Sequence, residues 1–387
     1  MDRERSAHRE HPSGQASAST SSEYGGSPEC PLSERVFRRR ETHAVRCGNV
    51  VIGGGSPVSV QTMTKTDTRD VLATLAQVNQ CADAGADIVR VAVPDMEAAE
   101  ALRRIKAGAK CPIVADIHFD HNLAVAAIKA GADKIRINPG NIGGQERLLK
   151  VAREAKERGA AIRVGVNAGS LEREILERYG GPIPEALVES AQRSLEFLEE
   201  HGIGDLVVSL KSSSVRATVK AYVLMAEKTR WPFHIGITEA GPGTGGVVKS
   251  AVGISSLLTL GLGDTLRVSL TGSPLEEVKT ARSLLQAADA AVLGPDIISC
   301  PTCGRTQVNL IAVAEEVAER LKDIRTHLKV AIMGCPVNGP GEAKEADVGV
   351  ACGRDGGILF RRGKVLGRVP EGEIVDALVR LAREAAK

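Results

Sequence analysis

Eight short runs rich in valine and isoleucine recur along the chain, and a longer amphipathic stretch of alanine, leucine, glutamate and lysine follows each run. The runs are Val58–Met63, Ile88–Val93, Pro112–Ile117, Lys134–Asn138, Ile162–Asn167, Leu206–Leu210, Phe233–Thr238 and Thr265–Leu270. Successive runs start about thirty residues apart, the length of one strand, one helix and two short connections. The repetition predicts eight parallel βα units. Eight units favour a closed (β/α)8 TIM-type barrel, and an open doubly wound sheet is the alternative.

Glycines mark the turns that lead into four of these strands. The pattern Gly-Ala-Asp occurs at 85–87 and 131–133, and longer versions occur at 202–205 and 261–264. A glycine that ends a helix in the left-handed conformation, followed by a tight turn into a strand, explains the pattern. An additional excursion, residues 171–184, follows the fifth predicted strand.

The pattern changes after residue 290, where we expect a small α+β domain over residues 291–387. Its predicted elements are a Cys-Pro-Thr-Cys turn, a helix near Asn309–Ile324, a strand near Val330–Met333, a Gly/Pro-rich loop, three short strands and a final helix from Glu371. The barrel is assigned to residues 35–290. Residues 1–34 are rich in serine, glycine and charge and lack an apolar run, so they are predicted to form a disordered tail.

The composition excludes several classes of function. Fifty Lys and Arg against forty-eight Asp and Glu leave a net charge of +2, and only nine residues are aromatic, which argues against a nucleic-acid-binding protein. The longest uncharged stretch, Ser250–Gly263, is too short to span a bilayer. Eight irregularly spaced cysteines without a secretory signal indicate reduced thiols or metal ligands in a cytoplasmic protein.

Polar residues gather in the second half of the predicted strands, where barrel enzymes place their chemistry. They are Arg90, Asp116, His118, Arg136, Asn138, Arg163, Asn167, Ser209, Lys211, Thr238, Glu239, Arg267 and Ser269. Pairs two or four residues apart share one face of a strand. If that face points inward, five cations converge and only Asp116 and Glu239 offer counter-charge. Burying such a surplus is costly without an anionic ligand, so the pattern predicts a substrate with two phosphates.

A less specific interpretation exists for each of these residues. Any one arginine could form a salt bridge with solvent-facing partners at the rim, and this interpretation weakens only because five cations occupy equivalent positions. By default His118 is a hydrogen-bonded structural histidine, and Asp116 is its partner.

The sharpest chemical signal is a group of three cysteines. Cys300 and Cys303 form a Cys-Pro-Thr-Cys turn, and Cys335 follows in a loop with several glycines. A lone pair of this spacing is most often a zinc or redox site, but a third cysteine without a histidine favours an iron–sulfur cluster. The fourth position is open to Cys352 or to an oxygen ligand from Glu342, and the spacing alone favours Cys352. The remaining cysteines of the folded part, Cys47, Cys81 and Cys111, are predicted to be small buried apolar side chains.

With these residues in place, the chain resembles the 4-hydroxy-3-methylbut-2-enyl diphosphate synthase family over residues 35–387. The motifs that carry the resemblance are VQTMTKTDT (60–68), ADIVRVAVP (86–94), VADIHFD (114–120), KIRINPGNIG (134–143), IRVGVNAGSL (162–171), GITEAG (236–241), GDTLRVSL (263–270), CPTC (300–303) and GCPVNGPGE (334–342). The large insertion of the plant and parasite forms is absent, which is typical of the bacterial two-domain type.

The resemblance implies a barrel joined to a small domain that holds a [4Fe–4S] cluster through Cys300, Cys303, Cys335 and Glu342. It implies reductive opening of 2-C-methyl-D-erythritol 2,4-cyclodiphosphate, with two electrons supplied singly by ferredoxin or flavodoxin. It also implies a head-to-tail homodimer in which the cluster domain of one subunit caps the barrel of the other.

The resemblance also assigns roles to the residues of the predicted barrel mouth. Those implied to hold the diphosphate are Arg90, Arg136, Asn138, Arg163, Asn167, Lys211, Arg267 and Ser269. Asp116 and His118 are implied to support the pocket, and Glu239 to act as an acid near the departing hydroxyl group.

Two departures from the family and two rival functions accompany the resemblance. The loop after Glu239 reads GPGTGG where the family has GGARSG, and Pro336 replaces a valine beside Cys335. One rival is a barrel aldolase or synthase with a structural zinc, in which Lys211 would form a Schiff base. The other is a non-catalytic protein that binds a diphosphate.

Overall fold

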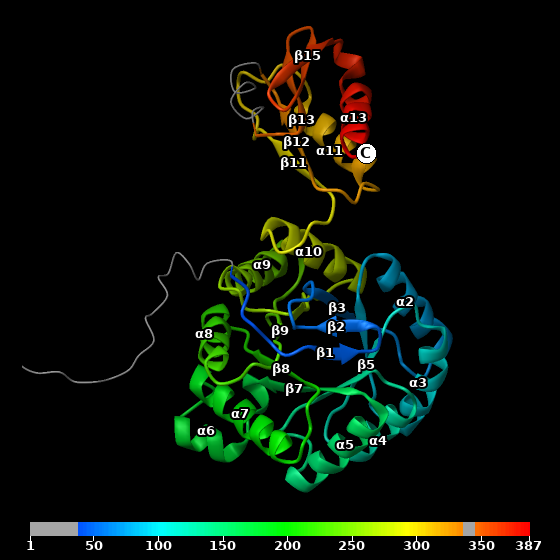
Figure 1. Cartoon of the computed structure of the whole chain (residues 1–387), viewed down its shortest axis with the longest axis vertical. Coiled ribbons are helices and arrows are strands. Elements are labelled where there is room, and N and C mark those ends of the chain that lie inside the picture. Colours follow the sequence, from blue (N-terminus) through cyan, green and yellow to red (C-terminus); the bar gives the residue numbers. More distant parts are fainter. Residues whose placement is uncertain (1–37, 336–344) are drawn as a thin grey trace, which may run out of the picture.

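The computed structural model describes residues 38–335 and 345–387, and its larger part is a parallel barrel (Figure 1). The barrel strands are β3 (Ser59–Met63), β4 (Ile88–Ala92), β5 (Ile113–Asp116), β6 (Lys134–Ile137), β7 (Ala161–Asn167), β8 (Leu206–Lys211), β9 (His234–Ile235) and β10 (Thr265–Leu266). Their order around the sheet is β8-β7-β6-β5-β4-β3-β10-β9, with every pairing parallel. A parallel bridge between Val208 and Phe233 joins the two ends. The predicted closed barrel is confirmed, and the open sheet is wrong.

A ring of helices surrounds the strands. These helices are α2 (Val71–Asp83), α3 (Met96–Gly108), α4 (His121–Lys129), α5 (Gln145–Arg158), α7 (Pro184–Glu200), α8 (Val215–Ala226), α9 (Gly243–Thr259) and α10 (Pro274–Ala287). The excursion after the fifth strand forms the short elements η1 (Ala168–Ser170) and α6 (Arg173–Tyr179). As predicted, glycines with positive φ precede the strands; Gly85 has φ 104° and Gly131 has φ 101°.

Side chains of each strand alternate between the helix ring and the barrel interior. On β4, Val89 and Val91 join the large apolar core under the helices, whereas Ile88 packs with a different cluster inside the barrel. The interior cluster is closed by an antiparallel hairpin, β1 (Val45–Cys47) and β2 (Val50–Ile52), which crosses one end of the barrel (Figure 1). The sequence analysis did not predict this hairpin, because two three-residue strands lie outside the βα repeat.

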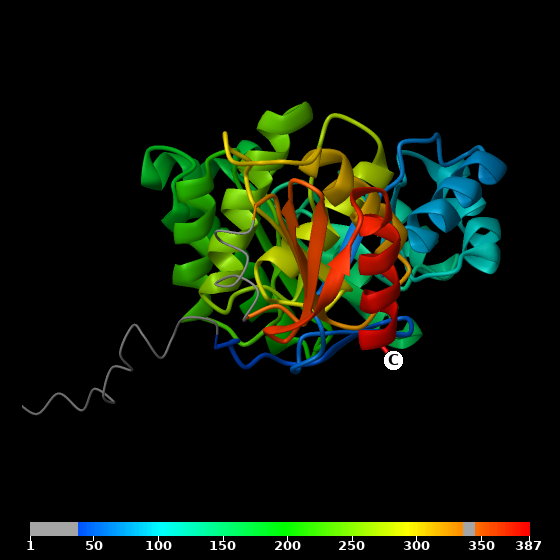
Figure 2. The ribbon, with the colours of Figure 1, turned by 90° about the horizontal axis from the view of Figure 1, so that it is seen from above.

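The second unit is a five-stranded sheet with helices on one face. Its elements are β11 (Pro295–Ser299), α11 (Leu310–Leu321), β12 (Leu328–Met333), β13 (Val348–Gly353), β14 (Gly356–Arg361), β15 (Lys364–Val369), η2 (Glu371–Glu373) and α13 (Ile374–Ala385). The sheet order follows the sequence; β11, β12 and β13 are parallel, and β14 and β15 are antiparallel additions. Figure 2 shows α13 along the sheet. The α+β prediction is confirmed, although β11 was missed.

The two units are joined by the segment between Ala287 and Pro295, in which the predicted boundary at residue 290 falls. The small unit stands beside α10 and not over an end of the barrel (Figure 1). The predicted tail, residues 1–34, and the predicted ligand Glu342 lie outside the described residues. Among the helices described, none is long and apolar enough to cross a membrane.

Candidate functional site

A polar cavity of about 150 Å³ lies where the barrel strands end. Its walls are Arg90, Asp116, His118, Arg136, Arg163, Asn167, Lys211, Thr238, Arg267 and Ser269. The structure therefore brings together nine of the ten side chains predicted to bind or support a substrate. The tenth, Asn138, is buried beside them; its amide donates to Ser170 Oγ at 2.6 Å, and its Oδ1 accepts from Gly140 N at 3.1 Å. Asn138 thus fixes the loop after β6.

Asp116 is the carboxylate that faces the cavity. Its Oδ1 lies 3.5 Å from Arg136 Nη1 and 3.8 Å from Arg90 Nη1. Burial by itself raises the pKa of Asp116, but Arg90, His118 and Arg136 outweigh it and hold the pKa well below its usual range. Asp116 is therefore a permanent negative charge among the cations.

His118 completes this group at the rim. Arg136 Nη1 lies 3.0 Å from His118 Nε2, and the same ring nitrogen lies 3.5 Å from Asp116 Oδ2. His118 therefore lies between the arginine and the carboxylate at the rim of the cavity.

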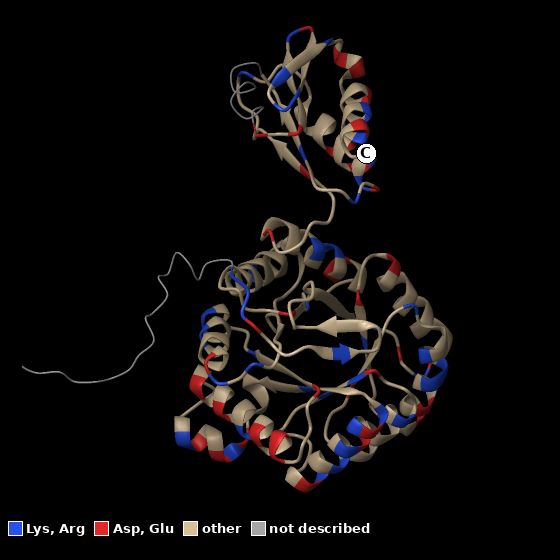
Figure 3. Ribbon diagram, viewed as in Figure 1, with Lys and Arg blue, Asp and Glu red and all other residues tan. Residues whose placement is uncertain are grey.

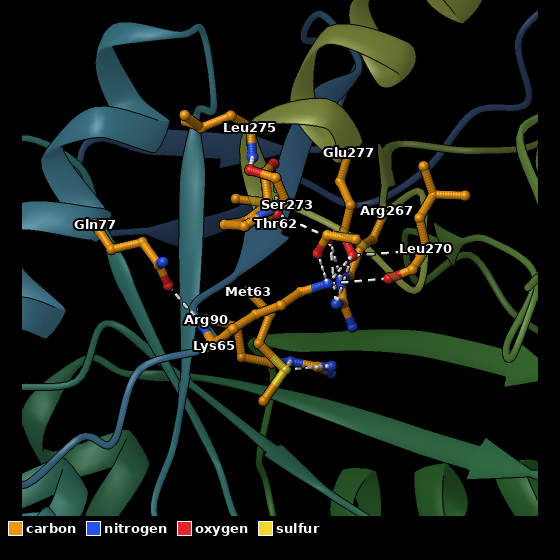
Figure 4. A network of polar contacts seen from close by, with 12 residues as sticks. Thr62, Met63, Lys65, Gln77, Arg90, Arg267, Leu270, Ser273, Leu275 and Glu277 are labelled. Atoms are coloured by element: carbon orange, nitrogen blue, oxygen red, sulfur yellow. Dashed lines mark hydrogen bonds and ion pairs between the residues drawn. The ribbon is translucent and has the colours of Figure 1, made fainter. Parts of the chain in front are cut away.

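Arg267 has its own counter-charge, which the sequence analysis missed. Its Nη2 lies 3.2 Å from Glu277 Oε2, and Glu277 is 1% exposed at the start of α10. The same carboxylate accepts from Thr62 Oγ1 at 2.9 Å and from Leu270 N at 3.2 Å (Figure 4). An acid in the first turn of a helix is common, so its type and position gave no signal of this role. Burial, relieved in part by Glu277, lowers the pKa of Arg267 to about 10.

Glu239 was predicted as the second counter-charge among the cations, and the structure places it at the rim of the barrel mouth. The residue lies in an exposed turn after β9, one position beyond the cavity-lining Thr238, and it does not line the cavity. Its φ of 52° is in the left-handed region, which costs a non-glycine residue about 1 kcal/mol. The backbone therefore holds Glu239 at the rim at an energetic cost.

Arg163 and Lys211 have no such neutralisation among the described residues. Arg163 is 2% exposed, and its Nε and Nη1 make no hydrogen bond. Burial, together with Arg90 and Arg136, lowers the pKa of Arg163 well below its usual value. Burial, together with the arginines around it, Arg163 first, also lowers the pKa of Lys211 well below its usual value. Both side chains would gain from an anion in the cavity.

Two glycines make room for these cations. A Cβ on Gly165 would lie 2.9 Å from Arg136 Nε, and one on Gly236 would lie 2.4 Å from the carbonyl oxygen of Arg267 and 3.2 Å from Lys211 Nζ. Each position therefore needs a residue without a side chain. Both glycines occur within predicted strands. The sequence did not predict their close contacts, because these contacts are made with residues of neighbouring strands.

A second polar layer lies in the barrel below the cavity. It includes the fully buried Lys134 and His234, and neither side chain has a hydrogen bond to a described residue. Burial and the cations around it, Arg163 first, keep the pKa of His234 well below its usual value. The layer therefore adds a lysine charge beneath Arg163, and this charge has no hydrogen bond to a carboxylate of the described residues.

The three cysteines predicted as metal ligands line one cavity of about 120 Å³. Cys300 and Cys303 follow β11, and Cys335 follows β12, so two parallel strands deliver them to one edge of the sheet. Gly334 N donates to Cys300 Sγ at 3.3 Å. Within residues 38–335 and 345–387, no three Cys, His, Asp or Glu side chains are close enough to enclose a metal ion.

The other cysteines behave as apolar side chains. Cys47, Cys81 and Cys111 are buried, as predicted. Cys352 is 0% exposed in the core between the sheet and its helices, and burial raises the pKa of its thiol to about 11. It does not line the cavity of Cys300.

Comparison with known proteins places both units. A family model described as the GcpE TIM-barrel domain matches residues 42–282, and one described as the GcpE protein C-terminal domain matches residues 296–384. The chain belongs to the GcpE family. The two GcpE models correspond to the barrel and to the small sheet unit.

Several curated proteins similar to this GcpE-family chain are named 4-hydroxy-3-methylbut-2-en-1-yl diphosphate synthase (flavodoxin). The protein from Geobacter sulfurreducens is 54% identical over 88% of this chain and 97% of its own length. Those from Caldanaerobacter subterraneus subsp. tengcongensis and Ruminiclostridium cellulolyticum are 52% and 51% identical, over 91% and 90% of this chain and 99% and 98% of their own lengths.

Proposed function

We propose that this chain is a 4-hydroxy-3-methylbut-2-enyl diphosphate synthase. It opens 2-C-methyl-D-erythritol 2,4-cyclodiphosphate reductively: two electrons and two protons enter, and the linear diphosphate and one water leave. Its relatives of about half identity carry this name over nearly their whole length. The observation that carries the proposal is the cavity with the buried Arg163 and Lys211, neither of which has an ion pair within the described part of the chain, because a diphosphate supplies the charge that they lack.

We assign different roles to the cations that line the cavity. Arg163 and Lys211 bind the phosphate oxygens, while Arg90 and Arg136 are oriented by Asp116. The cations stabilise the charge that develops on the phosphate as its ring bond to carbon breaks. Glu239, at the rim, delivers a proton to the departing hydroxyl group.

We further propose that Cys300, Cys303, Cys335 and Glu342 hold a [4Fe–4S] cluster. The donor set fits such a cluster: three sulfurs line one cavity, and the Gly334 amide donates to Cys300 Sγ, as amides do around cluster sulfurs. When bound, the cluster supplies electrons one at a time. A carboxylate as fourth ligand is harder and more labile than a thiolate, so it can yield to a substrate oxygen.

The choice between Glu342 and Cys352 can be tested directly. Cys352 lies in the apolar core, so Cys352→Ser should leave a brown, active enzyme. Glu342→Ala should lose the cluster or most of the activity. Iron content and the visible spectrum of both variants measure this, and the opposite pair of results would indicate four cysteine ligands.

We also propose a head-to-tail homodimer. The cavity at the barrel mouth and the cavity of the cysteines share no residue, and the small unit stands beside the barrel. Two chains arranged head to tail would bring each set of cysteines to the other chain's mouth. Flavodoxin, which the names of the relatives specify, is the proposed electron donor, and ferredoxin is the alternative. The cytoplasm is the proposed compartment.

Anaerobic purification, visible spectroscopy and turnover of the cyclic diphosphate test the function. We expect a brown protein that forms the linear diphosphate when a reductant is present. A colourless zinc protein that cleaves a phosphorylated metabolite through Lys211 would instead indicate an aldolase, and tight diphosphate binding without turnover would indicate a binding protein. The names of the relatives favour neither alternative.

A further inference from the structure

The sheet of the small unit ends at the exposed edge strand β15, whose surface has no role in the proposed function. We name Arg361, at the end of β14, together with Lys364, Val365, Leu366 and Arg368 of β15 the β15 flank. All are exposed; Val365 and Leu366 are 71% and 54% exposed. β15 pairs only with β14 among the strands described, so its outer edge is open to another protein.

The charge of this flank is strongly one-sided. Residues 354–369 contain five cations and one acid. Arg362 is paired with Asp347, at 3.5 Å, but the cations of the β15 flank form no ion pair with any described residue. Lys and Arg colour the β14–β15 hairpin in Figure 3.

Protection of an edge strand is the simpler explanation of such charges, since lysine on an edge discourages pairing with another sheet. Two observations argue for more than protection. A register shift at Leu359 and Phe360 already distorts this edge. Two exposed apolar side chains, Val365 and Leu366, lie between Lys364 and Arg368 along the strand, and exposed apolar side chains among charged ones are a feature of docking surfaces.

The position of the flank suits transfer of electrons. Across the sheet, three strand spacings, about 14 Å, separate β15 from β12, the strand that precedes Cys335. Along the strands, Arg368 lies at the level of Met333, near Cys335, and Lys364 at the level of Val330, farther from it. The flank lies at the side of the sheet, so a protein docked there leaves the cysteine edge free to face a second chain.

We propose that the β15 flank docks an acidic protein that carries one electron at a time. The proposal rests on the proposed function. At each encounter the carrier is oxidised by one electron and the cluster centre is reduced by one, so two encounters supply one turnover. A second copy of this chain fits less well, because its barrel mouth presents cations to cations.

A charge reversal tests the proposal with the full-length, cluster-loaded enzyme. The variant Lys364→Glu/Arg368→Glu keeps the edge charged but changes its sign. The control Arg103→Glu/Arg104→Glu reverses two exposed cations on α3. The first readout is the dissociation constant for oxidised flavodoxin at low and high salt, and the second is turnover with flavodoxin or with dithionite.

We expect the flank variant to bind flavodoxin at least about tenfold more weakly at low salt, with a smaller salt dependence than the wild type. Its dithionite-driven turnover should match the wild type, and the control should match in every measurement. Leu366→Ser should also weaken binding while leaving dithionite-driven turnover intact.

Unchanged flavodoxin binding in both flank variants would overturn the docking proposal. A flank variant that changes only the monomer–dimer equilibrium would also overturn it, since the flank would then be a contact between copies. Failure of the wild type to turn over the cyclic diphosphate with dithionite would instead contradict the proposed function, and the binding measurement would still decide on the flank.

Discussion

The barrel mouth and the cysteine cavity are built in opposite ways. At the mouth, strands of a closed ring carry the cations, and Arg90, Arg136, Arg163 and Lys211 are each less than a tenth exposed. In the small unit the cysteines stand on loops beyond the strand ends, and Cys303 is exposed. The mouth therefore holds its cations inside a closed ring of strands, whereas the cysteines depend on loop backbone for their positions.

The closed ring of strands and the loops are therefore suited to different tasks. A closed ring of strands can keep like charges together because the surrounding packing prevents them from separating. A loop cannot hold like charges together against their repulsion, but it can release a ligand and bind it again. The proposed function accordingly assigns charge recognition to the barrel and redox chemistry to the loops.

Of the substitutions described, Cys300→Ser should give the largest difference between the effect on turnover and the effect on substrate binding. We expect turnover to fall by at least about a thousandfold, because the cluster loses a ligand. The substrate dissociation constant, measured by calorimetry, should stay within about twofold of the wild type, since the barrel cations are untouched. A parallel loss of substrate binding would contradict the division.

Arg163→Ala should show the converse effect. Loss of a buried guanidinium that pairs with phosphate is expected to weaken substrate binding about 100-fold, or ~2.7 kcal/mol. Iron content should remain that of the wild type. Arg103→Ala on the exposed face of α3 is the matched control. Wild-type affinity for the cyclic diphosphate in Arg163→Ala would remove the basis for the cavity assignment.

Mixed dimers test whether the two regions of one active site come from different chains. Cys300→Ser and Glu239→Ala chains are each expected to be inactive alone. After random mixing, about half of the dimers contain both chains and each has one complete site, so about a quarter of wild-type activity should return. Mixed dimers that form, as verified by mass, and stay inactive would place the whole site within one chain.

Lys134→Met removes the buried lysine of the polar layer below the cavity. Of the substitutions described, it should affect turnover least. Burial, opposed by Cys47 and reinforced by Arg163, lowers the pKa of Lys134 to about 8, against 10.5 for an ordinary lysine. Between these values the unfolded chain binds more protons than the folded chain, so the free energy of unfolding rises with pH, by about 3 kcal/mol in total.

Urea unfolding at several pH values from 7 to 10.5 measures this rise. Lys134→Met should lose the rise and be more stable than the wild type at pH 7, where the buried charge costs most. Lys228→Met, which changes an exposed lysine, should retain the wild-type profile. An unchanged pH dependence in Lys134→Met would show that burial of the charged Lys134 side chain does not lower the free energy of unfolding.

Much of the barrel and its mouth could be predicted from the sequence. A period of two within each strand and a βα unit of about thirty residues are local patterns, and they place alternate side chains on one face. Arg90, Arg136 and Arg267 therefore reached a common cavity as predicted. Cys81 and Cys111 likewise followed the apolar faces of their elements.

Other features were decided only by the tertiary structure. Glu277 lies on α10, yet its partners Thr62 and Arg267 lie on the barrel side, so only the closed ring makes it a counter-charge. The same ring leaves Glu239 exposed at the rim. The sequence by itself determined the faces on which side chains lie, because those depend on periods along one strand or helix. The tertiary structure decided which faces meet, because pairing of the first strand with the last depends on closing the whole chain.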